Sequence, residues 1–342
     1  AYTTGSSGPT VGGQLLSISG ANFGTVASVQ FLSPDMGVQN CELSSIGQTD
    51  SLIICIVPPG QGRSVPFQVT VSSQVSSYVA GVTIYNYDAP VIQTASVLTS
   101  PTSGGGMITI TGLNFGVTSS TNYSIAIGSF NVPQTDVTFR NHTQAVFKIP
   151  RGYGTGLTIS IVVSGQSSTY APGSGSLLFN YAPPTIASVT GCLLDVGITT
   201  TQCAVAGGDV LTITGTNFGN NPSVLSGQIG GTSTAASTCT AFAIVTPDTV
   251  IRCTLGARPT GGFNLPLAIT VSGQTAKQNI ISFAGPSFTP ATIDVASASQ
   301  NGQVTKTSTS LALLVDPTSG SPFPIKLTGQ FFGSSESAIT IT

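Results

Sequence analysis

Gly12-Gly13-Gln14-Leu15-Leu16-Ser17-Ile18-Ser19-Gly20-Ala21-Asn22-Phe23-Gly24 returns along the chain. Three later segments repeat it: Gly105-Gly106-Met107-Ile108-Thr109-Ile110-Thr111-Gly112-Leu113-Asn114-Phe115-Gly116, then residues 207–219, and a less regular copy at residues 324–333. A repeat of this length and order indicates one structural unit that is used several times. The sequence therefore predicts a tandem array of similar domains.

Each position of the repeat has a physical role. Two leading glycines permit a bend that side chains would obstruct. Leu16 and Ile18 alternate with serines, which is typical of a strand with one buried face. Gly20 lets another backbone approach or marks a bulge, while Asn22 tolerates the left-handed region and Phe23 is expected to plug the core. The loop offers no acid, base or nucleophile, so we do not expect catalysis there.

The spacing of the copies predicts the domain boundaries. The motif asparagines Asn22, Asn114 and Asn217 lie 92 and 103 residues apart, which suits domains of about 100 residues. We expect domains at residues 1–88, 89–182 and 183–285 and a partial domain at 286–342, the first of them without its leading strand. Short proline-bearing linkers between them are expected to restrict neighbouring domains to a stiff string.

Charge and hydropathy exclude several classes of function. Charged residues make up 6 % of the chain, against roughly 25 % in ordinary soluble domains. Nine basic and eleven acidic residues are scattered along it, so no patch could follow phosphates and we expect no nucleic-acid partner. Apolar runs stay well below the roughly 18 residues of a membrane helix, so we expect no membrane-spanning segment.

Six cysteines occur in a suggestive pattern. Two pairs are separated by 14 residues and occupy matching places in their repeats, and the third flanks an insertion. We predict three disulfides, Cys41–Cys55, Cys192–Cys203 and Cys239–Cys253, each worth about 3 kcal/mol in the chain-entropy model. Six free thiols would not explain the two equal spacings, and zinc would need other spacings. Disulfides would place the protein outside the cytosol, in an extracellular or cell-surface setting.

Two sequons offer sites for N-linked glycans. They are Asn122-Tyr123-Ser124 and Asn141-His142-Thr143. In an extracellular protein, Asn122 and Asn141 are candidates for glycosylation. Covalent glycans would also solvate a surface that has few charges.

The full pattern resembles the IPT/TIG family of immunoglobulin-like domains. Pro90-Val91-Ile92 and Pro184-Thr185-Ile186 open the second and third units, the glycine-rich motif follows, and a Phe/Tyr-rich strand closes the unit. The resemblance implies an all-β fold, with early-set immunoglobulin-like β-sandwiches of about seven strands in a linear array. Members of the family occur in receptors, transcription factors and cell-surface proteins, so the fold alone does not choose a function. The chain lacks the basic loops of the DNA-binding relatives and the cysteine-rich modules of plexin-like receptors.

An enzymatic function finds no constellation to support it. The single histidine, His142, lies inside a sequon, where we expect it to be exposed and inert. Asp209 replaces Gln14 and Met107 of the other copies, so the repeat does not require a carboxylate. The remaining acids that we considered are isolated: Asp35, Glu42, Asp50 and Asp136. We therefore predict no catalytic residue, metal or cofactor.

Two non-catalytic functions remain. The preferred one is a structural segment of a long glycosylated extracellular fibre or cell-surface array, with further copies of the same domains as partners. The alternative is an adhesive or glycan-binding ectodomain, but there is no Trp, and Tyr85, Tyr87 and Tyr181 are expected to cover domain junctions. The partial end domains favour a window of a longer array over strands supplied by a neighbouring subunit.

Overall fold

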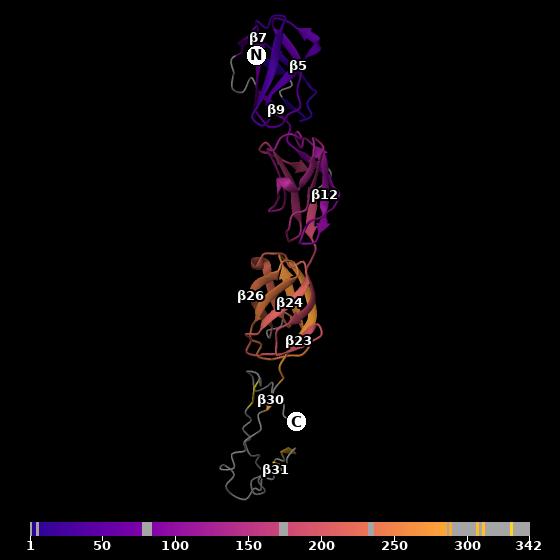
Figure 1. Ribbon diagram of the computed structural model, residues 1–342, viewed down its shortest axis with the longest axis vertical. Coiled ribbons are helices and arrows are strands. Elements are labelled where there is room, and N and C mark those ends of the chain that lie inside the picture. The colour runs from indigo at the N-terminus through magenta and orange to yellow at the C-terminus, as the bar shows by residue number, and fades with distance from the viewer. Residues whose placement is uncertain are drawn as a thin grey trace.

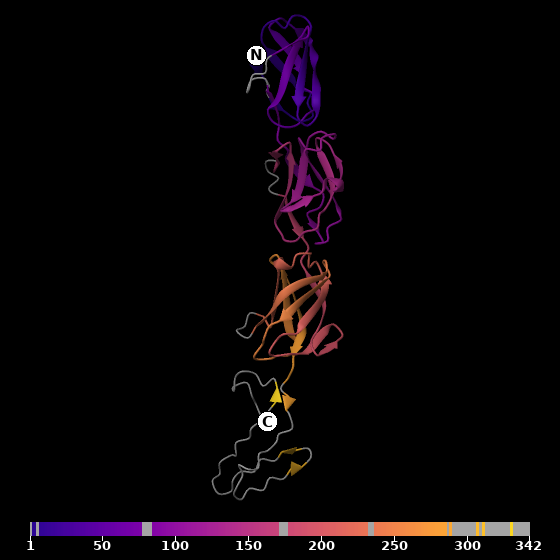
Figure 2. The same cartoon turned by 60° about the vertical axis from the view of Figure 1, so that its left-hand side comes forward.

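The computed structural model describes residues 2–4, 7–76, 84–170, 177–231 and 236–285, and four two-residue strands beyond them. These strands are β30 (Ser287–Phe288), β31 (Lys306–Thr307), β32 (Ser310–Leu311) and β33 (Gly329–Gln330). Most of the expected fourth domain lies outside the described residues, and of its copy of the motif only Gly329 and Gln330 are described. Apart from two 3-10 turns, the regular secondary structure of the described chain is all β-strand, which confirms the predicted fold class. Figures 1 and 2 show three sandwiches lying end to end.

Nine strands make up the described part of the first sandwich. They are β1 (Tyr2–Thr4), β2 (Ser7–Gly8), β3 (Leu15–Ser19), β4 (Ala27–Ser33), β5 (Gly37–Gln48), β6 (Leu52–Ile56), β7 (Val65–Val71), β8 (Gln74–Val75) and β9 (Ile84–Tyr87). The long β5 pairs with β4 at its start and with β6 at its end, so it links the two layers. The prediction of a missing leading strand is wrong, because β1 pairs antiparallel with the motif strand β3.

The second sandwich contains two separate sheets. Its elements are β10 (Val91–Ala95), β11 (Thr99–Ser100), β12 (Met107–Leu113), β13 (Tyr123–Ile127), β14 (Phe130–Val132), the 3-10 turn η1 (Gln134–Asp136), β15 (Val137–Arg140), β16 (Gln144–Lys148), β17 (Leu157–Val163), β18 (Gln166–Ser167), β19 (Thr169–Tyr170) and β20 (Leu178–Tyr181). One sheet has the order β15-β16-β12-β10-β19, and the other has β11-β20-β17-β13-β14.

The third sandwich repeats the plan of the first. Its elements are β21 (Thr185–Thr190), β22 (Leu194–Val196), β23 (Thr199–Cys203), β24 (Val210–Thr216), the 3-10 turn η2 (Pro222–Val224), β25 (Leu225–Ile229), β26 (Ser237–Thr246), β27 (Val250–Leu255), β28 (Leu265–Val271) and β29 (Gln274–Phe283). The strand order is β21-β24-β27-β26-β25-β28-β29-β23-β22. The insertion expected before the third motif forms the hairpin of β22 and β23.

The motif behaves as its residue types predict. Its asparagines, Asn22, Asn114 and Asn217, have φ angles of 63°, 60° and 59°. The phenylalanine that follows each of them is buried. At the close-approach glycine of the second copy, Gly112, an added Cβ would lie 1.9 Å from the carbonyl oxygen of Val91. The register of β10 against β12 also shifts just beyond this contact.

The register of the glycine pair in the second copy differs from the prediction. Gly104 and Gly105 have positive φ angles and correspond to Gly12 and Gly13. The N–H of Gly13 donates to the carbonyl of Val57, and the N–H of Gly105 donates to the equivalent Ile149. The second copy therefore begins one residue earlier than its letters suggest, because three consecutive glycines make the alignment ambiguous.

Each sandwich has its own hydrophobic core. Disulfides join the six cysteines as Cys41–Cys55, Cys192–Cys203 and Cys239–Cys253. In the second sandwich Phe147 pairs with Ile108 as Cys55 pairs with Leu16, so it occupies the place of the second cysteine. Phe147 is fully buried, and apolar packing therefore replaces the bridge there.

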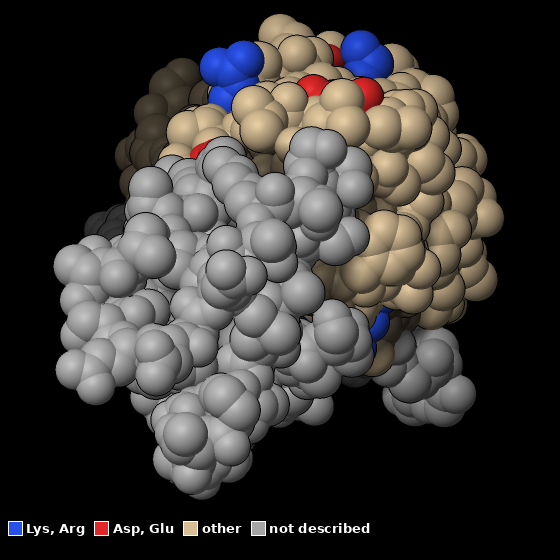
Figure 3. All heavy atoms as spheres, turned by 90° about the horizontal axis from the view of Figure 1, so that it is seen from below, with Lys and Arg blue, Asp and Glu red and all other residues tan. Residues whose placement is uncertain are grey.

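The described part of the chain contains no helix long and apolar enough to cross a membrane. Charges are few on the described surface. Viewed along the long axis, the face in Figure 3 shows separated charged groups among uncharged atoms.

Candidate functional site: the interdomain junctions

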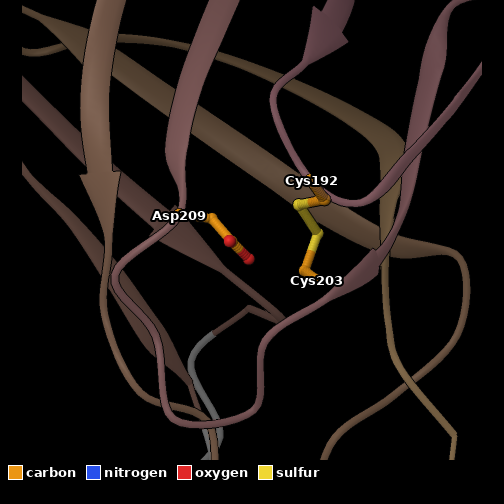
Figure 4. Close-up of side chains that lie close together, drawn as sticks. All are labelled: Cys192, Cys203 and Asp209. Atoms are coloured by element: carbon orange, nitrogen blue, oxygen red, sulfur yellow. A yellow bond between two sulfur atoms is a disulfide. The ribbon is translucent and has the colours of Figure 1, made fainter.

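The cluster of Cys192, Cys203 and Asp209 is a structural feature of the third sandwich (Figure 4). Both sulfur atoms belong to one disulfide, so neither is a thiolate that could bind a metal. The carboxylate of Asp209 accepts a hydrogen bond of 2.7 Å from the N–H of Ala204. This carboxylate therefore has a local role, which the comparison of motif copies did not reveal.

The other acids that the sequence singled out do not come together. Asp136 lies 3.9 Å from the Lys148 ammonium, in a largely solvent-accessible pair, which contributes little to stability. Asp50 accepts a 3.2 Å hydrogen bond from the N–H of Gly24. Glu42 is exposed on β5. Among these residues the structure assembles no nucleophile with a base or pair of acids, so the site of interest lies elsewhere.

A threonine of each preceding sandwich inserts into the next one. At the first junction the Thr10 N–H donates to Asn114 Oδ1 at 3.1 Å, and Thr10 Oγ1 lies 2.9 Å from His142 Nδ1. At the second, the Thr102 N–H donates to Asn217 Oδ1 at 3.3 Å, and its hydroxyl donates to Asp248 Oδ1 at 2.7 Å. The two junctions therefore repeat one arrangement.

His142 and Asp248 occupy the same position of the fold. The motif phenylalanine donates its N–H to the carbonyl of His142 in the second sandwich and to that of Asp248 in the third. The prediction that His142 is exposed and inert is wrong, because the junction half-buries it. Burial, and secondarily the nearby Arg140 guanidinium, lowers the pKa of His142 below 6.5, so the neutral imidazole is favoured.

The motif asparagine also holds the linker. Asn114 Nδ2 donates to the carbonyl of Ala89 at 3.2 Å, and Asn217 Nδ2 donates to that of Pro183 at 2.9 Å. One side chain thus fixes both the preceding sandwich and the segment that joins it. The sequence predicted only the left-handed backbone of this asparagine. Its hydrogen bond to a residue 104 positions away leaves no local pattern in the sequence.

A glutamine provides a second repeated contact. Gln166 Nε2 donates to the carbonyl of Tyr87 at 3.0 Å, and Gln274 Nε2 donates to that of Tyr181 at 2.9 Å. Both tyrosine rings are buried in the cores, and their backbones rather than their rings meet the next sandwich. Burial raises the pKa of both phenols.

A glycine of the preceding sandwich lies against a serine of the next. An added Cβ at Gly62 would lie 3.2 Å from the Cβ of Ser164, and one at Gly154 would lie 3.3 Å from the Oγ of Ser272. Both glycines have φ angles near the upper end of the left-handed region, 96° and 98°. Larger residues would therefore strain the backbone and crowd the serine of the next sandwich.

One loop position differs between the junctions. Gln61 Oε1 accepts from the Val117 N–H at 3.1 Å, and its Nε2 donates to the Ser120 and Ser164 hydroxyls at 2.7 and 2.8 Å. At the second junction, Tyr153 stands in the equivalent loop and its hydroxyl accepts from Asn221 Nδ2 at 3.1 Å. The constant contacts are thus accompanied by contacts particular to each junction.

Asp35 adds a carboxylate to the first junction. It accepts hydrogen bonds from the Ser164 hydroxyl and from Asn122 Nδ2, the latter at 2.8 Å. Burial alone would raise its pKa, but the hydrogen bonds from Ser164, Asn122 and Gln61 lower the pKa below its ordinary value. The carboxylate form is therefore the one that the junction stabilises.

Arg140 supports the loop that receives Gln61. Its Nη2 donates to the carbonyls of Val117 and Ser120 at 2.8 and 2.6 Å. The guanidinium also lies 4.0 Å from the centroid of the Tyr123 ring, a cation–π contact. Its burial lowers the pKa of Arg140. In the described hydrogen bonds Arg140 contacts only carbonyls of its own sandwich, so it positions the loop without contacting the first sandwich.

Several solved structures are similar to parts of this chain. A surface glycan-binding protein from Prevotella bryantii is 20 % identical over 47 % of this chain and 36 % of its own, with a TM-score of 0.34. The plexin A4 extracellular region is 16 % identical over 86 % and 25 %, with a TM-score of 0.27. The Down syndrome cell adhesion molecule is 12 % identical over 82 % and 40 %, also at 0.27.

The chain thus spans less than half the length of these structures. No curated protein sequence matches it significantly. The model of the IPT/TIG domain family matches residues 3–84, 90–181 and 196–290, which together are most of the chain. Three sandwiches, each built around the same motif strand, agree with that match. The chain belongs to the IPT/TIG family, with three of its domains in tandem.

Proposed function

We propose that this chain is a non-catalytic structural segment of a long, glycosylated extracellular fibre or cell-surface array. The repeated junction is the observation that carries the proposal. Thr10, Asn114 and Gln166 at the first junction have the same partners, position for position, as Thr102, Asn217 and Gln274 at the second. A contact that is repeated in register sets the same relation between successive domains, as a rod requires.

Three further features support an extracellular rod. The disulfides lie in the first and third domains, and such bonds persist in oxidising compartments. The two linkers, residues 88–90 and 182–184, lie between consecutive strands and are each held by a motif asparagine, so domain orientation is restrained. The low charge of the surface leaves solvation to hydroxyls, amides and attached sugars.

The two sequons differ in their surroundings. Asn122 Nδ2 donates to Asp35 across the first junction, and a sugar on that nitrogen would replace this hydrogen bond. The Asn141 side chain uses its Oδ1 to accept from the N–H groups of Thr143 and Gln144, and Nδ2 takes part in none of the described hydrogen bonds. We therefore propose higher glycan occupancy at Asn141 than at Asn122.

Imaging and mass spectrometry test the proposal together. Negative-stain micrographs of native material should show strings or filaments, and isolated compact particles would contradict the rod. Peptide mapping should find three disulfides and a glycan on Asn141. Reduced cysteines with both sequons bare would contradict the extracellular placement. Specific binding on a glycan array would instead favour an adhesive ectodomain.

A further inference from the structure

The first domain carries an exposed copy of the surface that receives a threonine at both junctions. Asn22 corresponds to Asn114, and Gln74 to Gln166. Asp50 corresponds to His142, because each carbonyl accepts the N–H of the motif phenylalanine. We call the surface formed by Asn22, Gly24, Asp50 and Gln74 the free receiving face.

This face is complete but without a partner among the described residues. Asn22, Asp50 and Gln74 are all exposed, whereas Asn114 and Gln166 are each 9 % exposed at the first junction. The Asn22 and Gln74 side chains make none of the described hydrogen bonds. The counterparts of Asn22 and Gln74 bind a neighbouring domain at the two junctions, so these two side chains are available to bind one here.

The shape of the face also suits a neighbouring domain. An added Cβ at Gly116 would lie 2.4 Å from Gln61 Oε1 of the preceding domain, whereas at Gly24 the nearest atom, in Val71, is 3.9 Å away. The adjacent Val26 is 77 % exposed. Space and apolar surface are thus present where the preceding domain inserts its loop at the first junction.

We infer that the free receiving face binds another IPT/TIG domain, through a loop that carries threonine as Thr10 and Thr102 do. The inference rests on the proposed function and specifies its partner. The partner's threonine N–H would donate to Asn22 Oδ1 and its hydroxyl to Asp50, while Gln74 would donate to a backbone carbonyl. The first two of these contacts would reproduce those that Asn217 and Asp248 make with Thr102 at the second junction.

A second copy of this chain does not offer that loop from its described domains. Thr10 and Thr102 are already buried at its internal junctions. In the third domain, Val205 occupies their position, since its carbonyl accepts the N–H of Arg258 as that of Thr10 accepts the N–H of Gly60. Valine has no hydroxyl to donate to Asp50. The partner is therefore an IPT/TIG domain other than these three.

A cysteine trap tests the inference in a lengthened chain. Residues 1–93 are added before residues 2–342. Tyr2 pairs with Ser19 as Thr94 pairs with Thr111, so Tyr2 follows the added Gln93 in the place that Thr94 has in the natural chain. Thr10→Cys in the added copy is combined with Asp50→Cys in the original one. The expected result is a disulfide between these two cysteines. Its yield should be at least about tenfold above that of a control in which Val38→Cys replaces Asp50→Cys, because docking raises the effective concentration. Val38 is 58 % exposed and lies beside the opposite end of the first domain.

The unextended chain provides the internal reference. Thr10→Cys with His142→Cys reports on a junction that the structure already contains. Crosslinking of this pair without crosslinking of the new pair would overturn the inference and leave the rod intact. Failure of both pairs would contradict the junction on which the proposed function rests. Concentration-dependent dimers of residues 1–342 that bury Asn22 would show that a second copy is the partner and would also overturn the inference.

Discussion

Replacing Asn114 with glycine separates the two roles of the motif asparagine. Glycine adopts the φ of 60° at this position without strain, so Asn114→Gly removes the side chain and keeps the backbone. Two hydrogen bonds disappear, from the Thr10 N–H and to the Ala89 carbonyl. Each such bond contributes about 0.5–1.5 kcal/mol net. We expect the first junction to lose about 1–3 kcal/mol of stability.

Hydrogen exchange of the Thr10 amide measures this loss directly. The N–H of Thr10 is bonded to Asn114 Oδ1, so opening of the junction exposes it. A factor of ten corresponds to about 1.4 kcal/mol, and exchange should therefore accelerate about 5- to 150-fold. The amide of Thr102, at the second junction, should be unaffected and serves as a reference within the same molecule.

Asn22→Gly is the matched control. Its φ of 63° equals that of Asn114 within a few degrees, but its side chain is exposed. The backbone consequences of the two substitutions are the same, and only Asn114→Gly removes contacts between domains. Unchanged Thr10 exchange in Asn114→Gly, or equal losses of stability in both variants, would refute the junction role and leave only the left-handed turn.

Three other predictions concern pH, shape and redox state. The folded-state pKa of His142 is lowered, so its stabilising contribution is present above the unfolded value of 6.5 and is lost as pH falls through the folded pKa. The thermal unfolding temperature of the second domain should fall over this pH range, and His142→Gln should abolish that pH dependence. Gly116→Ala should destabilise by about 1–3 kcal/mol more than Gly24→Ala, because only its Cβ meets Gln61; equal denaturation midpoints would contradict this. Reduction should cost the first and third domains about 3 kcal/mol per bridge and leave the second unchanged, as differential scanning calorimetry with and without reductant would show.

The sequence predicted the fold because its signals are local. Alternation in Leu16 and Ile18, the buried Phe23 and the left-handed Asn22 all depend on neighbours a few residues away. Such patterns are repeated in each copy, and chance does not produce them in phase. The equivalence of Phe147 to a cysteine could be predicted for the same reason, from its distance to the motif.

The junctions could not be predicted, because they join residues that no local pattern connects. Thr10 precedes the glycine pair in the first copy and Thr102 does so in the second, which was the available signal. Nothing in that spacing says that the hydroxyl meets His142 in one case and Asp248 in the other. His142 was misjudged because its sequon suggested exposure, whereas its position relative to the motif phenylalanine decides its burial.

The two junctions divide their residues into constant and variable parts, and this division has a consequence for assembly. Thr, Asn and Gln are constant and set the orientation of each domain on the next. One position is variable: the threonine hydroxyl meets an imidazole, His142, at the first junction and a carboxylate, Asp248, at the second. Since each contact joins unlike ends of two domains, it is heterologous and does not close on itself. In the proposed rod, the constant residues would dock each domain on the next in the same way, while His142 and Asp248 give each junction its own chemistry.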